Sequence, residues 1–161
     1  MIDHDNQSKP ARVETLGEIG LQQFAPYLMN RIMGRYNHTL RGDLKSQGLT
    51  VPQARAMAVL SVMETINVND LAIYAVIEQS TMSRTLDGLE EQGLVKRAAS
   101  EQDSRVKNVS LTDKGRAEFN KSWPAMEAAF SAMFKDIDQA EYAALINTLH
   151  KMLKNIRQHE I

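Results

Sequence analysis

The chain has 161 residues, of which 43% are hydrophobic and 24% charged, proportions typical of one globular domain or two small ones that share a core. No apolar run approaches the roughly 20 residues of a membrane-spanning helix, and the first residues lack a secretory signal, so we expect a cytoplasmic protein with no membrane partner. The absence of cysteine excludes disulfides, Cys-ligated zinc and thiol catalysis.

Charge is unevenly distributed along the chain. The net charge is −1 and the pI about 6.4, which argues against a nucleic-acid partner when taken alone. Residues 94–116, however, hold six basic and three acidic groups, so this segment is +3 and the remainder −4. The basic segment is therefore the part of the chain to examine for anion binding.

The N-terminal region predicts an arm followed by a long helix. Residues 1–12 are polar and aperiodic, and we expect a mobile arm. Apolar residues recur at helical spacing over 21–44, and they predict a main helix that begins at Pro26 and ends at Gly48.

Three shorter helices are predicted next, each from its own boundary signals. Thr50 and Gln53 form a capping box that opens a helix to about Met63. A second cap, Asn67 with Asp70, opens a helix over 71–75, and a third helix over 78–92 is closed by Gly93. The inward-facing residues of these helices are predicted to be Ala54, Met57, Leu60, Leu71, Ala72, Ala75, Met82, Leu86 and Leu89.

Beyond Gly93 the hydrophobic period changes from helix to strand. Residues 94–98 read as a strand, and Val109 and Leu111, which alternate with polar residues, read as its antiparallel partner. The polar segment 99–105 between them forms the tip of the hairpin.

Two long helices complete the chain. Thr112 can cap the first of them, in which Pro124 predicts a kink or a restart. Asp138 and Glu141 form the cap of the last helix, whose apolar face consists of Tyr142, Leu145, Ile146, Leu149, Leu153 and Ile156.

The order of elements predicts a mainly α fold with a small β-hairpin wing, that is, a winged helix-turn-helix flanked by terminal helices. The terminal helices have apolar faces that the central lobe cannot cover, so we expect a homodimer. The expected divisions are an arm (1–12), N-terminal dimerisation helices (13–48), a DNA-binding lobe (49–111) and C-terminal dimerisation helices (112–161).

The third short helix has the pattern of a recognition helix. Its buried stripe leaves a polar row exposed, in which Arg84 can fork onto guanine and small hydroxyls can reach phosphates or base edges of double-stranded DNA. Ser80, Arg84 and Asp87 point away from the buried stripe, and Thr81 and Ser83 lie on its flanks. The residues expected to contact DNA are Ser80, Thr81, Ser83 and Arg84. The same residues are also consistent with a helix end that is merely solvated.

The hairpin supplies cations beside that helix. Lys96, Arg97, Arg105 and Lys107 are expected to contact the neighbouring minor groove or backbone, where the negative potential favours Arg. Asp103 is expected to hold the tip, through a turn or an ion pair. An ordinary solvated hairpin is the alternative interpretation.

Several collinear motifs resemble the MarR family of bacterial transcription regulators. They are Asn67-Val68-Asn69-Asp70-Leu71-Ala72, Ser80-Thr81-Met82-Ser83-Arg84, Leu89-Glu90-Glu91-Gln92-Gly93-Leu94-Val95-Lys96-Arg97, Asp103-Ser104-Arg105 and Leu111-Thr112-Asp113-Lys114-Gly115. The resemblance covers about residues 26–160. It implies a dimeric winged-helix repressor, or less often an activator, that binds pseudo-palindromic DNA and is released by a small aromatic or amphipathic effector.

Two positions depart from the family pattern. The turn before the recognition helix usually carries Leu-Gly but here reads Ala75-Val76, and without Gly we expect Val76 to avoid a left-handed conformation and to reshape the turn. Glu78 replaces the usual Ser or Asp cap and is a weaker cap.

The remaining residues do not indicate an enzyme. There is no Gly-rich phosphate loop and no strand–turn–helix nucleophile motif, and we expect neither a cofactor nor a metal. The histidines are scattered, at His4, His38, His150 and His159, and methionines on helix faces are read as core filler or as the lining of a ligand cleft. The competing function is a winged-helix protein-interaction module that no longer binds DNA.

Overall fold

The computed structural model describes residues 13–100 and 105–156. The expected mobile arm, His4, Asp103 and His159 lie outside the described residues. Contacts divide the chain into two units, Met1–Arg35 and Tyr36–Ile161, and the expected domain boundaries remain predictions. Within the described ranges, no helix is long and apolar enough to cross a membrane.

The first unit contains two short helices and the start of a long one. Helix α1 (Leu16–Ile19) is opened by a capping box of Thr15 and Glu18, and the 3-10 helix η1 (Leu21–Gln23) follows; neither was predicted as a separate element. Helix α2 (Ala25–Ser46) carries Pro26 in its first turn, as predicted.

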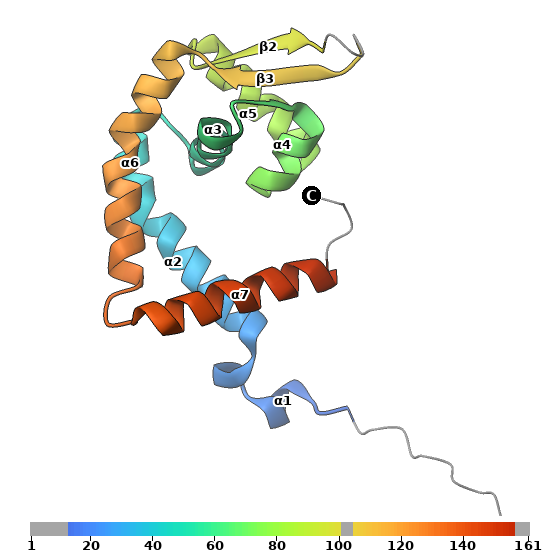
Figure 1. Ribbon diagram of the computed structural model, residues 1–161, viewed down its shortest axis with the longest axis vertical. Helices are drawn as coiled ribbons and strands as arrows, with labels where there is room; N and C mark the ends of the chain where they lie inside the picture. Colours follow the sequence, from blue (N-terminus) through green and yellow to red (C-terminus); the bar gives the residue numbers. More distant parts are fainter. Residues whose placement is uncertain (1–12, 101–104, 157–161) are drawn as a thin grey trace, which may run out of the picture. The chain divides into compact units, whose positions relative to one another are not determined.

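Helices α3 (Val51–Met63), α4 (Val68–Ala75) and α5 (Gln79–Glu91) form the central lobe (Figure 1). The predicted capping box is present, because the Gln53 N–H donates to Thr50 Oγ1 at 3.3 Å and Gln53 Oε1 accepts from the Thr50 N–H at 2.9 Å. Asn67 Oδ1 accepts from the Asp70 N–H at 2.9 Å. That cap starts α4 three residues earlier than predicted.

The strands form one antiparallel sheet in the order β1-β3-β2. Strands β2 (Val95–Ala99) and β3 (Lys107–Leu111) are the predicted hairpin, which we call the wing (Figure 1). Strand β1 (Thr65–Asn67) was not predicted, since three residues with one buried side chain show no alternation. Ile66 lies opposite Val109, and both are buried.

One hydrophobic core joins these elements, and the residues predicted to face inward from α3, α4 and α5 are all part of it. The largest of its fully buried side chains belong to Met57, Leu60, Leu71, Met82, Leu86, Leu89 and Val109. The core continues into α2 through Leu40 and Leu44 and into the next helix through Phe119 and Met126. These contacts hold α5 against the lobe.

The last two helices are α6 (Asp113–Met133) and α7 (Gln139–Ile156). Thr112 caps α6 by accepting from the Gly115 N–H at 3.0 Å, and Asp138 Oδ1 accepts from two N–H groups of α7, as predicted. The restart considered at Pro124 is wrong, because α6 continues through this residue. Proline has no N–H, so the Asn120 carbonyl, four residues earlier, lacks its helical donor. Asn120 and Pro124 are both exposed, so this carbonyl can bond to water instead.

Gly115 allows α6 to approach the α5–β2 turn. A Cβ at this position would lie 1.8 Å from the Leu94 carbonyl oxygen, whereas a Cβ at Gly42 of α2 would meet nothing within 4 Å. Gly115→Ala is therefore expected to lower the free energy of unfolding by about 1–3 kcal/mol. Gly42→Ala should leave it unchanged or raise it by up to about 1 kcal/mol, since both residues are helical.

Urea unfolding of the two variants measures this difference. Equal stability of Gly115→Ala and Gly42→Ala would show that the close approach to Leu94 is not needed.

Candidate nucleic-acid interface

Helix α5 has one fully buried face and one exposed polar face. Met82, Leu86 and Leu89 have no accessible surface, and buried Thr85 satisfies its hydroxyl by donating to the Thr81 carbonyl at 2.8 Å. The residues of this helix predicted to contact DNA, Ser80, Thr81, Ser83 and Arg84, are all exposed. Within the described part of the chain, the Arg84 guanidinium forms no ion pair. The first two turns of α5 thus present hydroxyls and one uncommitted cation to solvent.

The turn that leads into α5 has the backbone of a glycine turn although it carries valine. Val76 adopts φ 53° and ψ 55°, so the prediction that it avoids the left-handed region is wrong. Its N–H donates to the Ile73 carbonyl at 3.1 Å, and the Ile77 N–H donates to the Ala72 carbonyl at 2.9 Å. This is a Schellman motif, whose two hydrogen bonds require a left-handed residue.

The same motif ends α2 and α5, where the left-handed residues are glycines. Gly48 has φ 72° and Gly93 has φ 69°, each with the corresponding pair of hydrogen bonds. The helix-turn-helix therefore keeps the usual turn geometry at the cost of backbone strain at Val76.

The start of α5 is held by its neighbours rather than by its cap. Glu78 makes no side-chain capping hydrogen bond, as the weaker cap predicted. Instead, Gln79 Nε2 donates to Asn69 Oδ1 of α4 at 3.2 Å. Because the Glu78 side chain does not cap them, the N-terminal N–H groups of α5 keep their partial positive charge at an exposed surface. Such a surface favours an anion such as phosphate.

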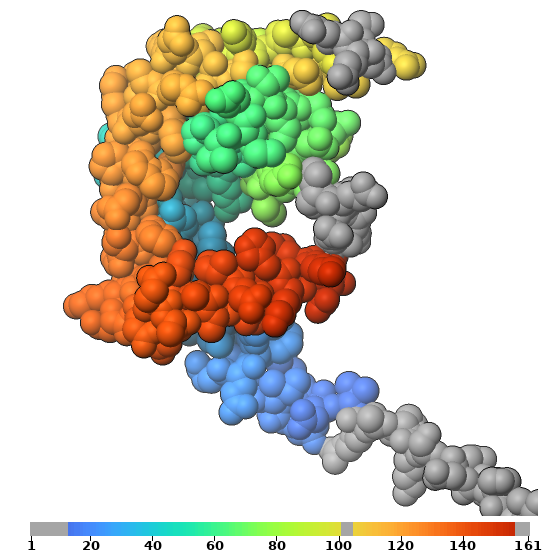
Figure 2. All heavy atoms as spheres, in the orientation of Figure 1, coloured from blue at the N-terminus to red at the C-terminus, as the bar shows by residue number. Residues whose placement is uncertain are grey.

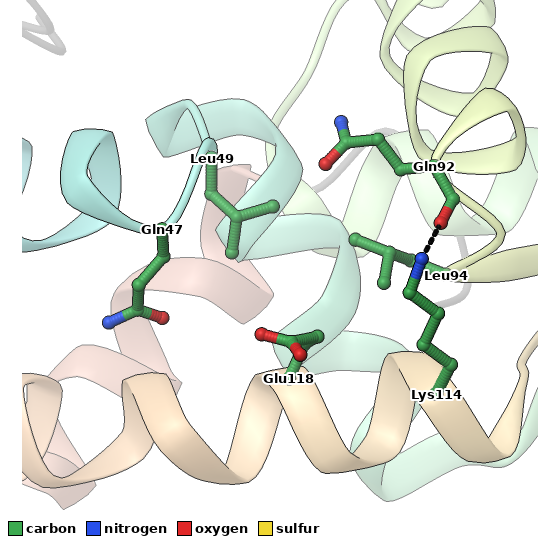
Figure 3. Close-up of a pocket in the computed structure, with 6 residues that line it drawn as sticks. All are labelled: Gln47, Leu49, Gln92, Leu94, Lys114 and Glu118. Atoms are coloured by element: carbon green, nitrogen blue, oxygen red, sulfur yellow. Dashed lines mark hydrogen bonds between the residues drawn. The ribbon is translucent and has the colours of Figure 1, made fainter.

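The far end of α5 is held by the start of α6. Thr112 donates through its hydroxyl to the Gly93 carbonyl at 2.7 Å and through its N–H to the Leu94 carbonyl at 3.0 Å. Lys114 Nζ donates to the Gln92 carbonyl at 2.6 Å (Figure 3). Sequence analysis missed these contacts, since it read Thr112 only as a cap and Lys114 only as part of a motif.

The wing cations fall into two groups. Lys96 and Lys107 are exposed, and neither has an ion pair with a described residue; Arg105 is also exposed. Arg97 differs, because its Nη2 pairs with Asp87 of α5 at 2.8 Å and its Nε donates to Glu90 at 3.0 Å. Its predicted contact with DNA is therefore in competition with two carboxylates.

A small cavity lies where α6 meets the central lobe (Figure 3). Its volume is about 230 Å³, and it is lined by Gln47, Leu49, Gln92, Leu94, Lys114 and Glu118. Pockets for drug-sized ligands are larger and more apolar. The methionines proposed for a ligand cleft do not line it, and Met57 and Met126 are buried in the core instead.

Comparison with known proteins identifies the family. A sequence model of the MarR family matches residues 49–107. A MarR-family transcriptional regulator from Silicibacter pomeroyi is 49% identical in its crystal structure, with a TM-score of 0.87 over 92% of this chain and 100% of the other. The chain belongs to the MarR family.

Two further relatives agree with this. A second MarR-family regulator from Silicibacter pomeroyi DSS is 30% identical, with a TM-score of 0.81 over 98% of this chain and all of the other. The HTH-type transcriptional repressor IacR of Pseudomonas putida is 26% identical over 86% of this chain and 83% of its own. These MarR-family relatives are transcriptional regulators, not enzymes.

The strain at Val76 makes a prediction about stability. Val76 is 79% exposed, so Val76→Gly removes little buried surface and relieves a left-handed valine, which outweighs the added entropy of an unfolded glycine. We expect a gain of about 1 kcal/mol, or about 2–4 °C in thermal midpoint. Differential scanning calorimetry measures it, and Val62→Gly, at an exposed helical position, is the matched control and should be destabilising. A lower midpoint for Val76→Gly would contradict the strain argument.

Proposed function

We propose that this protein is a cytoplasmic transcription regulator, acting as a repressor, that binds a pseudo-palindromic operator as a homodimer. The observation that carries the proposal is the two-faced α5, whose buried apolar stripe fixes the helix while Ser80, Thr81, Ser83 and Arg84 stay exposed. A helix of 13 residues is about 20 Å long, which suits insertion of its first turns into the major groove.

The residues divide into base readers and backbone contacts. Arg84 is the candidate for a bidentate contact with guanine, and the hydroxyls of Ser80, Thr81 and Ser83 suit base edges or phosphates. Lys96, Arg105 and Lys107 of the wing suit the flanking backbone or minor groove. Asp103 is proposed to structure the tip between them.

The exposure of helix α7 is the reason for proposing a homodimer. This helix has no buried residue, although Leu145, Ile146, Leu149 and Leu153 lie along it at helical spacing. One side of the helix is in view along its length in Figure 2, in red and orange. A partner copy that covers this face would bury it and would bring two α5 helices to one duplex, about 10 bp apart.

The protein-interaction alternative loses one of its two supports. It was favoured by the acidic balance of the chain and by the altered turn at Val76. Because that turn has the left-handed backbone of a glycine turn, the substitution gives no reason to doubt that the recognition helix is presented normally. Selection of bound fragments from genomic DNA distinguishes the two functions, since an interaction module would enrich no sequence.

We also propose control by a small aromatic or amphipathic effector that binds near the junction of α6 and the lobe. The support is the contact between the start of α6 and the Gln92 and Gly93 carbonyls just after α5, through which a shift of α6 would move α5. A metabolite screen that measures operator affinity tests it, and a screen without any active compound would leave it unsupported.

Arg84 and Lys107 are expected to contribute in different ways. Arg84→Ala should weaken operator binding by about 1–3 kcal/mol and relax the preference at one base position. Lys107→Ala should weaken binding to operator and random duplex alike and flatten the dependence of log K on log salt by about 1. Fluorescence anisotropy over a salt series measures both. Equal losses on both kinds of DNA for both variants would refute this division.

The dimer is tested on the exposed side of α7. Leu145 and Leu153 are 39% and 60% exposed, so aspartates there should not disturb the protomer but would place charges in the proposed interface. We expect sedimentation equilibrium to give a mass of twice 18.1 kDa for the wild type and about half of that for the Leu145→Asp, Leu153→Asp variant. Val62→Asp, at a 78% exposed position on α3, is the control and should stay dimeric. A monomeric wild type would end the proposal.

A further inference from the structure

Arg97 is bound by two carboxylates of the recognition helix. Its Nη2 contacts Asp87 Oδ1 at 2.8 Å and Glu90 Oε2, and its Nε donates to Glu90 Oε2 at 3.0 Å. The backbone N–H of Arg97 also donates to Glu90 Oε1, at 3.3 Å. Glu90 therefore binds both the side chain and the main chain of one wing residue.

These contacts add a side-chain link between α5 and strand β2, beyond the core and the turn that already connect them. Strand β2 is at the edge of the sheet, with β3 on one side only, and Glu90 takes up an N–H group of its backbone. Asp87 and Glu90 lie three residues apart and so share one side of α5. The guanidinium thus connects the C-terminal half of α5 to the wing.

The charges of this cluster do not suit a phosphate ligand. One guanidinium faces two carboxylates, which leaves a net charge of about −1 where DNA phosphates would have to approach. The Arg97 side chain is 28% exposed, against 52% for Asp87 and 40% for Glu90. Arg97 differs in this from Lys96 and Lys107, which have no carboxylate partner among the described residues.

The protonation equilibria agree with the geometry. The hydrogen bond from Arg97 lowers the pKa of Glu90, and the bond to Glu90 raises the pKa of Arg97, with Asp87 adding to the effect. Since the pKa of Glu90 is lowered on folding, the contact stabilises the fold at neutral pH and is lost as the pH falls through that pKa.

We propose that Arg97 is a positioning residue that sets the wing relative to the recognition helix, and that it is not a phosphate ligand. The inference rests on the proposed operator binding. It specifies how the two elements proposed to contact DNA, α5 and the wing, are held at a fixed position relative to each other. A wing fixed in this way places its free lysines at a constant distance from Arg84 on α5.

Glu90→Gln gives the sharpest test, because the two roles predict opposite signs. If Arg97 positions the wing, loss of the carboxylate should weaken operator binding about 3- to 30-fold, as for other couplings between elements. If Arg97 is a phosphate ligand restrained by Glu90, removal of a negative charge and release of the guanidinium should tighten binding. Anisotropy with the full chain and its selected operator measures the sign.

Variants of Arg97 supply the second readout. Arg97→Gln and Arg97→Lys should both weaken operator binding without changing the salt slope, since an ammonium cannot fork between two carboxylates. Lys107→Gln is the matched control, and it should flatten the slope by about 1. Tighter binding by Glu90→Gln, a flatter slope for Arg97→Gln or full rescue by Arg97→Lys would each overturn the proposal.

A measurement without DNA separates this proposal from the proposed function. In a carbon-13 NMR titration, the Glu90 carboxyl should have a depressed pKa in the wild type and a higher one in Arg97→Gln. An ordinary Glu90 pKa in the wild type would overturn the link itself. A linked Glu90 in a protein that enriches no DNA fragment would instead refute operator binding and, with it, the role of Arg97 there.

Discussion

Burial of one face of α5 is the constraint on which the rest of the lobe depends. Met82, Leu86 and Leu89 are completely enclosed by the core, and full burial of such side chains stabilises by about 1.5–3 kcal/mol each. Their spacing fixes the rotation of the helix about its axis. The opposite row is therefore exposed by necessity, and polar residues there can change with the DNA sequence to be read without loss of the fold.

Rotation alone does not fix where the helix points, and three further contacts do. The turn at Val76 sets its start, carbonyl contacts from Thr112 and Lys114 hold its end, and Arg97 joins its side to the wing. Two of these contacts come from elements that follow α5 in the chain. The recognition helix is thus presented by its surroundings, and a change at α6 or at the wing reaches it directly.

Sequence reasoning predicted the elements that local signals specify and missed what only distant residues decide. Capping residues such as Thr50, Asn67 and Thr112 bond within three residues, so these caps were predictable, although the helix after Asn67 begins three residues earlier than predicted. The three-residue β1 has no period of its own and exists only because β3 pairs with it. Val76 was mispredicted because its local preference is overridden by the hydrogen bonds that end α4. The exposed row of α5 followed from the helical period, whereas the carboxylate partners of Arg97 lie on another element.

The chain has a net charge of −1, so its binding to DNA depends on where its cations are placed and not on its overall charge. The exposed cations of α5 and the wing include Arg84, Lys96 and Lys107, but the net charge of the chain is −1, so nonspecific attraction to phosphate is small for each protomer. A strongly basic protein tolerates imprecise placement because its field holds it on the duplex. In the proposed complex Arg84 meets a base and each wing lysine meets the DNA backbone, and both the α5–wing connection and a second copy of the chain increase the number of such contacts made at once. Fixed geometry and dimerisation therefore substitute for net positive charge.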